Sequence, residues 1–256
     1  MRIVAILTIA ERELIRYWRD KGRIFSSTFQ SLMFLFVFGA GFAKTLSSGN
    51  FGVDYIKFVF PGVIAMNVMG TSFFSTISTV WDREFGFLKE ILVAPVPRVA
   101  IAIGKTLGAV AIATIQATIM LLLAPLIGLN VTALSFVSVV GVMIILGFAT
   151  ASLGLLFASI VKTMENFGLI INLLVFPMFF LSGAFFPLKN TPTWMMTLSS
   201  ADPVTYGVDS FRSIMLGANA AGYILHPMGF NLAFLGIFAA IMIGASVFAF
   251  NKRGAL

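Results

Sequence analysis

The sequence predicts an all-α integral membrane protein that forms one domain over residues 1–256. The chain is 59% hydrophobic and only 11% charged, and its mean hydropathy is +1.01. Soluble domains average about a quarter charged residues, so this chain lies well outside their range. Long apolar runs, separated by short polar segments, predict six transmembrane helices. The net charge of +7 fits membrane topology and not nucleic-acid binding, because the basic residues flank the apolar runs.

The N-terminal segment, residues 1–23, is amphipathic. At helical spacing its apolar side chains gather on one face, which consists of Ile3, Ile6, Leu7, Ala10, Leu14, Tyr17 and Trp18. This pattern predicts an interfacial helix that lies in the headgroup plane, with its aromatic pair at the polar boundary. The alternative is an amphipathic helix packed on protein.

Six apolar runs then have the length of about 20 residues that a helical crossing requires. They cover residues 24–43, 58–80, 107–128, 134–161, 167–188 and 228–250. The first run is too long for a signal-peptide core, so it is interpreted as a retained span. Pro177 lies inside the fifth run and should kink it. Gly104 and Gly108 have the GxxxG spacing of close helix packing, which is weak evidence in a Gly-rich membrane protein.

The distribution of basic residues predicts the orientation of the spans. An even number of spans places both termini on one side. All but four of the 17 lysines and arginines lie at the two termini, between residues 81 and 106, or at Lys162. The remaining four are Lys44, Lys57, Lys189 and Arg212. Because cytoplasmic loops are enriched in Lys and Arg, both termini and the 81–106 segment are predicted to be cytoplasmic.

The stretch from Val80 to Arg98, VWDREFGFLKEILVAPVPR, is the one long charge-dense segment between two spans. Written as a helix, it places Phe85, Leu88 and Leu92 on one face, while charged residues spread over the rest. Two prolines near its end prevent the helix from continuing. A helix of this kind at the membrane surface can transmit force to a soluble partner. The alternative is a solvated loop that only connects two spans.

The segment from Lys189 to Pro227 is predicted to lie on the opposite, outer side. It combines prolines, aromatics and amphipathic pieces, and Trp194 and its neighbours are too apolar for water alone. This favours a segment that re-enters the outer leaflet or packs over a pore mouth, where protein must cover irregular backbone. Asp202, before a proline, is a helix-start signal. Asp209 and Arg212 are spaced for an i, i+3 ion pair, interpreted as a modest surface salt bridge rather than a gating element.

The sequence shows no pattern typical of a catalytic site. It has one histidine, no cysteine, and no acidic pair or metal-ligand cluster within the spans. Gly104-Lys105-Thr106 is rejected as a phosphate-binding loop because no buried strand precedes it, and Lys105 is interpreted as an interfacial anchor. No ionisable residue falls inside the six runs, which counts against proton-coupled transport, while sodium coupling through backbone carbonyls stays open. The phenylalanines, methionines and scattered amides of the spans suit amphiphilic or lipophilic cargo, and helix packing explains each of them equally well.

Three stretches together resemble the transmembrane subunits of type-2 ABC exporters. They are DREFGFLKEILVAPVPR at residues 82–98, SGAFFPLKNTPTW at 182–194 and DPVTYGVDSFR at 202–212. In that family a cytoplasmic coupling helix joins the second and third spans, and the last two spans flank a segment like the other two stretches. Six spans, an N-terminal interfacial helix and the lack of a Walker motif extend the likeness over essentially the whole chain.

The resemblance implies a multi-pass permease subunit of the cytoplasmic membrane, with no enzyme activity of its own. A second copy or a close relative would complete the pathway as a dimer, and two copies of a separate ATP-binding cassette subunit would bind ATP and Mg and drive it. The chain itself would bind no cofactor, metal or nucleic acid. We expect a hydrophobic or amphiphilic drug or lipid as cargo, with a lipid-linked glycan or polysaccharide as the alternative. The rival from another class is an ATP-independent secondary transporter or channel.

The expected roles of individual residues fall into three groups. The group expected to couple to the ATPase is Asp82, Arg83, Glu84, Phe85, Gly86, Leu88, Glu90 and Leu92. The group expected at the outer gate or re-entrant segment is Phe186, Pro187, Pro192, Trp194, Asp202, Pro203, Tyr206, Asp209 and Arg212. The polar and aromatic residues of the spans that we expect to line the pathway are Asn67, Thr71, Phe73, Asn172, Phe176 and Phe179.

Overall fold

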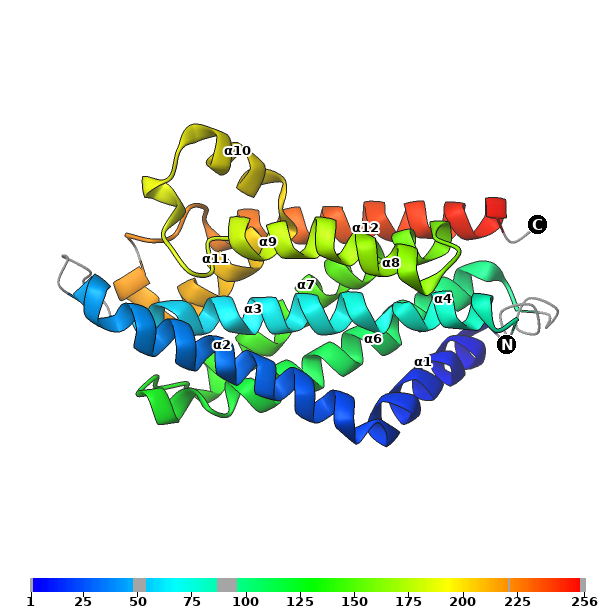
Figure 1. Cartoon of the computed structure of the whole chain (residues 1–256), viewed down its shortest axis with the longest axis horizontal. Coiled ribbons are helices and arrows are strands. Elements are labelled where there is room, and N and C mark those ends of the chain that lie inside the picture. Colours follow the sequence, from blue (N-terminus) through cyan, green and yellow to red (C-terminus); the bar gives the residue numbers. More distant parts are fainter. Residues whose placement is uncertain (1, 48–53, 87–95, 221, 254–256) are drawn as a thin grey trace.

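The computed structural model describes residues 2–47, 54–86, 96–220 and 222–253. Within these ranges the chain is helical and contains no strand. Figure 1 shows an elongated bundle whose long helices run along its long axis. The helix α1 and the last turn of α12 lie at one end, which we call the α1 end. The helices α10 and α11 lie at the other, which we call the α11 end.

The centre of the bundle is α3 (Tyr55–Ser75), and nearly all of its residues are buried. It packs against α2 (Lys21–Ser47), α6 (Arg98–Leu121), α7 (Ala133–Ile160) and α11 (Pro203–Leu216). The last helix, α12 (Met228–Arg253), packs along α7. A helix that is apolar on all sides has to be covered on all sides, which explains the central position of α3.

Five helical segments of the described chain are long and apolar enough to cross a membrane. They are Tyr55–Glu84, Arg98–Ile127, Ala133–Ile160, Met164–Leu181 and Met228–Ala249. These segments correspond to the second through sixth predicted runs. The first predicted run, residues 24–43, lies within α2, whose 27 residues are long enough for a core of about 30 Å at 1.5 Å per residue. Some of its side chains lie outside the described part, and its role as a sixth span stays a prediction.

The fifth predicted run contains a π-helical turn where we expected a kink. Its three parts are α8 (Met164–Ile170), the turn Ile171–Val175 and α9 (Phe176–Leu181). Proline lacks an N–H, and its ring crowds the carbonyl four residues before it, so a locally widened helix accommodates Pro177. The helix ends earlier than the predicted boundary at residue 188, because Gly183 takes a positive φ of 73° and turns the chain.

The second span extends further than its apolar run. The short helix α4 (Ile77–Glu84) follows α3 in the same direction, so Asp82 belongs to the end of this span. Gly86 then takes a positive φ of 79°, a backbone conformation that favours glycine. The prediction of one helix from Val80 onward is therefore wrong: its first residues continue the span, and the chain turns at Gly86. Residues 87–95 lie outside the described part, and a coupling helix there stays a prediction.

The N-terminal helix α1 (Arg2–Arg19) packs directly on α6. Tyr17 is buried, whereas Ile3, Leu7 and Trp18 are each more than half exposed. The predicted apolar face is thus divided between a protein contact and an exposed stripe. The packing on α6 supports the alternative of a helix packed on protein. A position in the headgroup plane stays a prediction, for which the exposed stripe is suited.

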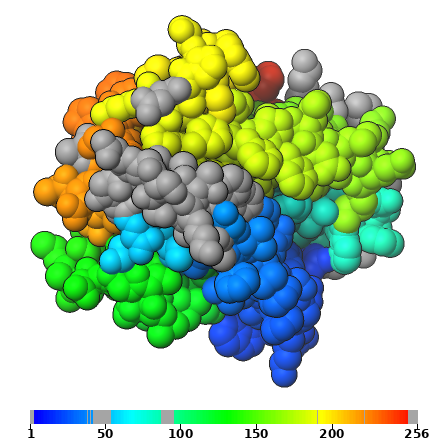
Figure 2. Space-filling view, turned by 60° about the vertical axis from the view of Figure 1, so that its left-hand side comes forward, coloured from blue at the N-terminus to red at the C-terminus, as the bar shows by residue number. Residues whose placement is uncertain are grey.

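The outer segment contains α10 (Thr193–Ala201) followed by α11, which covers the α11 end of the bundle. Figure 2 brings this end forward and shows the yellow and orange residues of the segment along its upper left side. The Tyr55 hydroxyl at the start of α3 donates to the Phe185 carbonyl at 3.0 Å. A Cβ at Gly62 would lie 2.7 Å from Ala184 backbone atoms, so α3 and the 183–184 turn are in close contact. The turn before the outer segment is therefore fastened to the central helix, and α11 packs on the same helix.

Candidate functional site

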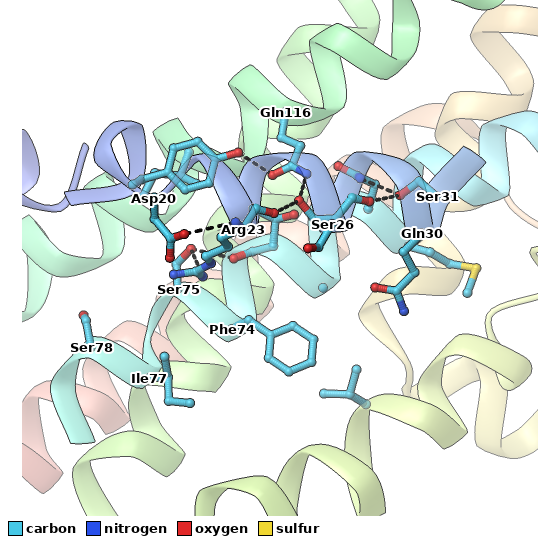
Figure 3. Close-up of a pocket in the computed structure, with 18 of the residues that line it drawn as sticks. Asp20, Arg23, Ser26, Gln30, Ser31, Phe74, Ser75, Ile77, Ser78 and Gln116 are labelled. Carbon is cyan, nitrogen blue, oxygen red and sulfur yellow. Dashed lines mark hydrogen bonds between the residues drawn. The ribbon is translucent and has the colours of Figure 1, made fainter. Parts of the chain in front are cut away.

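A cavity of about 490 Å³ lies among α1, α2, α3, α6 and α9, mostly toward the α1 end, and we call it the central cavity. Its volume is within the range of about 300–1,000 Å³ that is typical of small-molecule sites. Figure 3 shows polar side chains of α2 and α3 on one side and the ring of Phe74 projecting beneath them. This cavity is the candidate functional site.

Two polar stripes, one on α2 and one on α3, line the cavity. Each has a spacing of four residues, which keeps its members on one helix face. The stripes consist of Arg23, Ser27 and Ser31 on α2, and of Asn67, Thr71 and Ser75 on α3. Two hydrogen bonds join the stripes: Arg23 Nη2 donates to Ser75 Oγ at 3.2 Å, and Asn67 Nδ2 donates to Ser31 Oγ at 2.7 Å. Because these bonds are eight residues apart on each helix, they lie about 12 Å apart along the helix axis.

A third polar contact brings α1 and α6 into the same wall. The Tyr17 hydroxyl donates to Gln116 Oε1 at 2.5 Å, and Gln116 Nε2 donates to Ser27 Oγ. Gln116 and Tyr17 are both buried. A buried amide is stable only when its donors and acceptors are paired, so this chain of bonds fixes α1 against the cavity wall.

A large part of the remaining lining is apolar. It consists of Phe34 on α2, Val63, Met66 and Phe74 on α3, Ile112 on α6, and Val175, Phe176 and Phe179 around α9, together with Ile77 and Trp81 on α4. The rings of Phe176 and Phe179 meet edge to face, with centroids 6.2 Å apart. A Cβ at Gly70 would lie 3.6 Å from Phe179 Cζ, so this glycine leaves room beside the ring. The cavity is therefore amphipathic.

One acceptor in the cavity wall has no partner. Asn67 is only 7% exposed, and its Oδ1 has no hydrogen bond within the described part of the chain. A buried amide oxygen without a donor is costly, by about 1–3 kcal/mol. A molecule in the cavity that carries a hydroxyl, amide or water-bridged donor would satisfy it.

A buried ion network lies at the α1 end, beside the cavity. Lys105 Nζ on α6 is 2.7 Å from Asp82 Oδ2 on α4 and 3.3 Å from Glu13 Oε1 on α1. It also donates to Ser78 Oγ at 3.3 Å, and Arg12 reaches Asp82 Oδ1 at 2.9 Å. Lys105 is 3% exposed. Its interpretation as an interfacial anchor is therefore wrong, because two carboxylates hold its ammonium inside the protein.

The two glycines of the GxxxG spacing are the surface on which α1 lies. A Cβ at Gly104 would come within 2.9 Å of the Ile6 carbonyl oxygen, and one at Gly108 within 2.8 Å of Glu13 Cβ. The absence of side chains lets the helix backbones approach closely. This contact brings Glu13 next to Lys105.

The described residues of the expected coupling group lie at the junction of three helices. Arg83 donates to the carbonyls of Val161 and Ser159 at 2.7 and 2.9 Å, which places a cation at the C-terminal end of α7. Glu84 accepts the N–H of Met164 at 3.2 Å, at the start of α8. Phe85 is 78% exposed. Leu88, Glu90 and Leu92 lie outside the described residues.

The predicted surface salt bridge in the outer segment is wrong. Asp209 and Arg212 are both buried, and each bonds elsewhere. Asp209 Oδ2 accepts the N–H groups of Leu225 and His226 at 2.9 and 3.1 Å. Arg212 donates to the Gly183 carbonyl at 2.9 Å and lies over the ring of Phe58, with Cζ 3.9 Å from the centroid. Burial lowers the pKa of Arg212 to about 10.

The helix-start signal at Asp202 is confirmed. Its Oδ1 accepts the N–H of Val204 at 2.9 Å and caps α11. Its Oδ2 is buried and has no partner among the described residues, and burial raises the pKa of this carboxyl to about 8. Tyr206, one turn later, donates to the Ser200 carbonyl at 2.7 Å and stacks on Phe234 with centroids 3.8 Å apart. Pro203 lies in the first turn of α11.

The remaining residues expected at the outer gate lie before α11. Phe186 and Pro187 are half-buried, whereas Pro192 and Trp194 are exposed. Trp194 is 63% exposed on α10. The structure thus fixes Asp202, Tyr206, Asp209 and Arg212 by internal contacts and leaves an apolar surface on α10.

Four of the six residues expected to line the pathway do line the cavity: Asn67, Thr71, Phe176 and Phe179. Phe73 is fully buried instead, stacked on Phe167 with centroids 5.8 Å apart, and Asn172 is exposed outside the cavity. Sequence analysis missed Arg23, Ser27, Ser31 and Ser75. Their spacing of four on two neighbouring helices is the signal that could have identified them.

The described residues contain no evident metal-binding site. No group of three or more His, Asp or Glu side chains there is placed to hold a metal ion. The side chains of the central cavity provide hydroxyls, amides, guanidinium groups, two carboxylates and aromatic rings. This arrangement can bind and orient a molecule, and it has no nucleophile paired with a base.

Comparison with known proteins identifies the family. The family model described as "ABC-2 type transporter" matches residues 4–216. A protein named as transport permease ycf38, from Cyanophora paradoxa, is 27% identical over 240 residues, which are 92% of this chain and 81% of that protein. "Inner membrane transport permease YadH" of Escherichia coli is 27% identical over 221 residues, 84% of each chain.

A third relative is "Probable multidrug ABC transporter permease YbhR" of Escherichia coli. It is 31% identical over 172 residues, which are 65% of this chain and 46% of that protein, so the match covers about half of its length. The family match covers most of the chain, including the central cavity and the ion network. The chain therefore belongs to the ABC-2 type transporter family and is a membrane permease, not an enzyme, whose ATPase is a separate subunit.

Proposed function

We propose that this chain forms the translocation pathway of an ATP-driven exporter as a dimer, with ATP and Mg bound by two separate cassette subunits. The observation that carries the proposal is the amphipathic central cavity, bounded by α2, α3 and α9. Small-molecule sites combine apolar lining with a few placed polar groups. The polar stripes and the aromatic wall therefore suit a hydrophobic or amphiphilic cargo, as a drug or a lipid would be.

The proposed topology has six spans in the cytoplasmic membrane, with α2 as the first span. Both termini and the 87–95 segment then lie in the cytoplasm, and α10 and α11 lie on the outer side. The distribution of Lys and Arg supports this orientation. The α1 end carries the described basic residues of α1 together with Arg83 and Lys105.

Coupling to the ATPase would start at the turn after α4. Asp82 binds Lys105 and Arg12, so a displacement of α4 acts on α6 and α1. On α1, Tyr17 reaches Gln116 and through it Ser27 in the cavity wall. This contiguous set of contacts offers a route by which rigid-body motion at the cytoplasmic side could open the cavity.

Reconstitution of the permease with its cassette ATPase in lipid vesicles tests this function. We expect export of a fluorescent amphiphile to require ATP hydrolysis and to stop when the catalytic carboxylate of the ATPase is replaced. Transport that continues without the ATPase would contradict the proposal and favour an ATP-independent transporter or channel. Export of a lipid-linked glycan, with no export of amphiphiles, would support an ATP-driven exporter and contradict the proposed class of cargo.

A further inference from the structure

We propose that the central cavity binds an amphiphile with an anionic oxygen head group, a carboxylate or a phosphate, and that Arg23 holds this head group. The inference rests on the proposed function, because it names the chemical class of that cargo. Its starting point is a cation that lines the cavity and takes part in none of the ion pairs of the described chain.

Arg23 makes few contacts for a half-buried arginine. Its guanidinium has five N–H donors, and in the described structure one bond joins it to a side chain, from Nη2 to Ser75 Oγ at 3.2 Å. Taking a charge out of water is costly unless it is paired. Arginine binds carboxylates and phosphates through two parallel hydrogen bonds, so an anionic oxygen group matches its remaining donors. The Ser75 hydroxyl beside it already donates to the Thr71 carbonyl at 2.7 Å, so the guanidinium is the donor offered to such a group.

The other charges that line the cavity are already compensated or lie in solvent. Glu13 is 3.3 Å from Lys105, and Arg16 lies 4.0 Å from Asp82 and over the Trp81 ring. Asp20 is exposed, and its Oδ1 accepts the backbone N–H of Arg23 at 3.1 Å. Water solvates an exposed carboxylate, so Asp20 does not need a cationic ligand. Asp20 and Glu13 act electrostatically on Arg23, yet neither forms an ion pair with it in the described structure, so a ligand would supply a direct partner.

The rest of the cavity fits the chain of an amphiphile. Asn67 lies about 12 Å further along the helices, and its Oδ1 has no donor in the described structure. Phe34, Phe176 and Phe179 provide the apolar wall beside it. A molecule anchored at Arg23 would therefore extend an apolar chain along these rings, and a hydroxyl or amide in its linker could donate to Asn67.

Equilibrium binding of radiolabelled oleate to the full-length permease in a neutral detergent tests the head group. We expect oleate binding to be saturable. Lysophosphatidate, which has an anionic head group, should displace oleate, whereas neutral monoolein and cationic oleylamine should displace it at least ten times more weakly. Arg23→Gln should weaken oleate binding about tenfold or more, because a charge-assisted bond is lost, and Arg23→Lys should retain most of it. Lys21→Gln, an exposed change two residues away, is the matched control and should have no effect. Asp20→Asn should leave binding unchanged or strengthen it.

The chain of the ligand is tested at Gly70. Gly70→Leu would fill the space beside Phe179 and should reduce oleate binding, whereas Gly141→Leu, whose Cβ would have no neighbour within 4 Å, should not. Acetate or inorganic phosphate alone should not displace oleate. Displacement by these free ions at similar concentrations would show an anion site without a place for the chain, and would overturn the proposal.

Equal binding of oleate, monoolein and oleylamine, or full binding by Arg23→Gln, would also overturn it. So would the absence of saturable oleate binding to a permease that elutes as one folded species. These measurements use the permease alone. ATP-dependent transport by the assembled complex is measured separately, so the proposed function can hold when the head-group assignment fails.

Discussion

Lys105 and Asp82 form a buried ion pair between α6 and α4, with Nζ and Oδ2 2.7 Å apart. Glu13 of α1 completes the site at 3.3 Å from the same ammonium. One lysine thus joins the N-terminal helix to the ends of two helices that we assign as spans. The network lies beside the central cavity and includes Asp82, the first residue of the group that we expect to couple to the ATPase.

Replacement of Lys105 by methionine should destabilise the protein by about 3–5 kcal/mol, because the buried Glu13 carboxylate loses its cation and the buried Asp82 carboxylate loses one of its cations. Thermal unfolding in detergent, followed by size-exclusion chromatography, measures the loss. Lys162→Met changes an exposed lysine and should have little effect. If the triple variant Glu13→Gln, Asp82→Asn, Lys105→Met is no more stable than Lys105→Met alone, the charges are not the cause.

Gly104→Ala and Gly108→Ala should each displace α1 from α6. The added methyl would come within 2.9 Å of the Ile6 carbonyl oxygen or 2.8 Å of Glu13 Cβ, and overpacking of this kind costs about 1–3 kcal/mol. Cysteine pairs across the α1–α6 contact can report the displacement by crosslinking yield, since the chain has no other cysteine. Gly141→Ala meets no atom within 4 Å and serves as the control. Unchanged crosslinking in both variants would show that α1 does not lie on these glycines.

Asp202 should make the outer segment more stable at lower pH. Its pKa is raised from 3.8 to about 8 in the folded protein, so the folded state binds this proton more tightly than the unfolded state. The stabilisation is present below the unfolded pKa and is lost as pH rises toward 8. The melting temperature of the native protein should therefore fall between pH 5 and pH 8 by more than that of Asp202→Asn. Asparagine keeps the helix cap and does not titrate. An equal fall in both proteins would contradict a protonated Asp202.

Sequence periodicity predicted the helices well where one run corresponds to one helix. Ala133–Ile160 and Met228–Ala249 differ from the predicted runs by one residue at most at either end. It failed where a charged helix end is buried by distant partners. Arg12 and Asp82 are 70 residues apart, and no local pattern shows that α1 lies close enough to bury the end of α4. Hydropathy therefore ended the second span at Val80, four residues too early.

The candidate site was predictable only in part, because periodicity shows which residues share a helix face and does not show which distant residues contact them. The stripe of Asn67 and Thr71 lies on a span, and its spacing of four indicates one helix face. The matching stripe on α2 begins at Arg23, just before the predicted span, and was taken only as a topology signal. In the outer segment, Asp209 and Arg212 have the local spacing of an ion pair, yet the backbone of residues 225–226 and the 183–184 turn provide their actual partners. Tertiary contacts prevailed over local spacing.

The central claim is that the segment following α4 docks on a separate ATPase. Phe85 is apolar and 78% exposed at the start of this segment, and Leu88 is the apolar position that follows at helical spacing. Central apolar anchors of an interface typically contribute about 2 kcal/mol or more, which corresponds to roughly 30-fold in affinity. Asp82 and Arg83, which are bound within the permease, should matter for positioning the segment and not as direct anchors.

Co-purification of the cassette ATPase with permease variants in detergent tests this claim most directly. Leu88→Asp should release the ATPase or abolish cargo-stimulated hydrolysis while the permease elutes as one folded species. Leu134→Asp, at a position that is 79% exposed in the first turn of α7, should retain the ATPase and its stimulated hydrolysis. Full retention of the ATPase and of stimulated hydrolysis by Leu88→Asp would contradict the account and leave the segment as a plain connection between two spans.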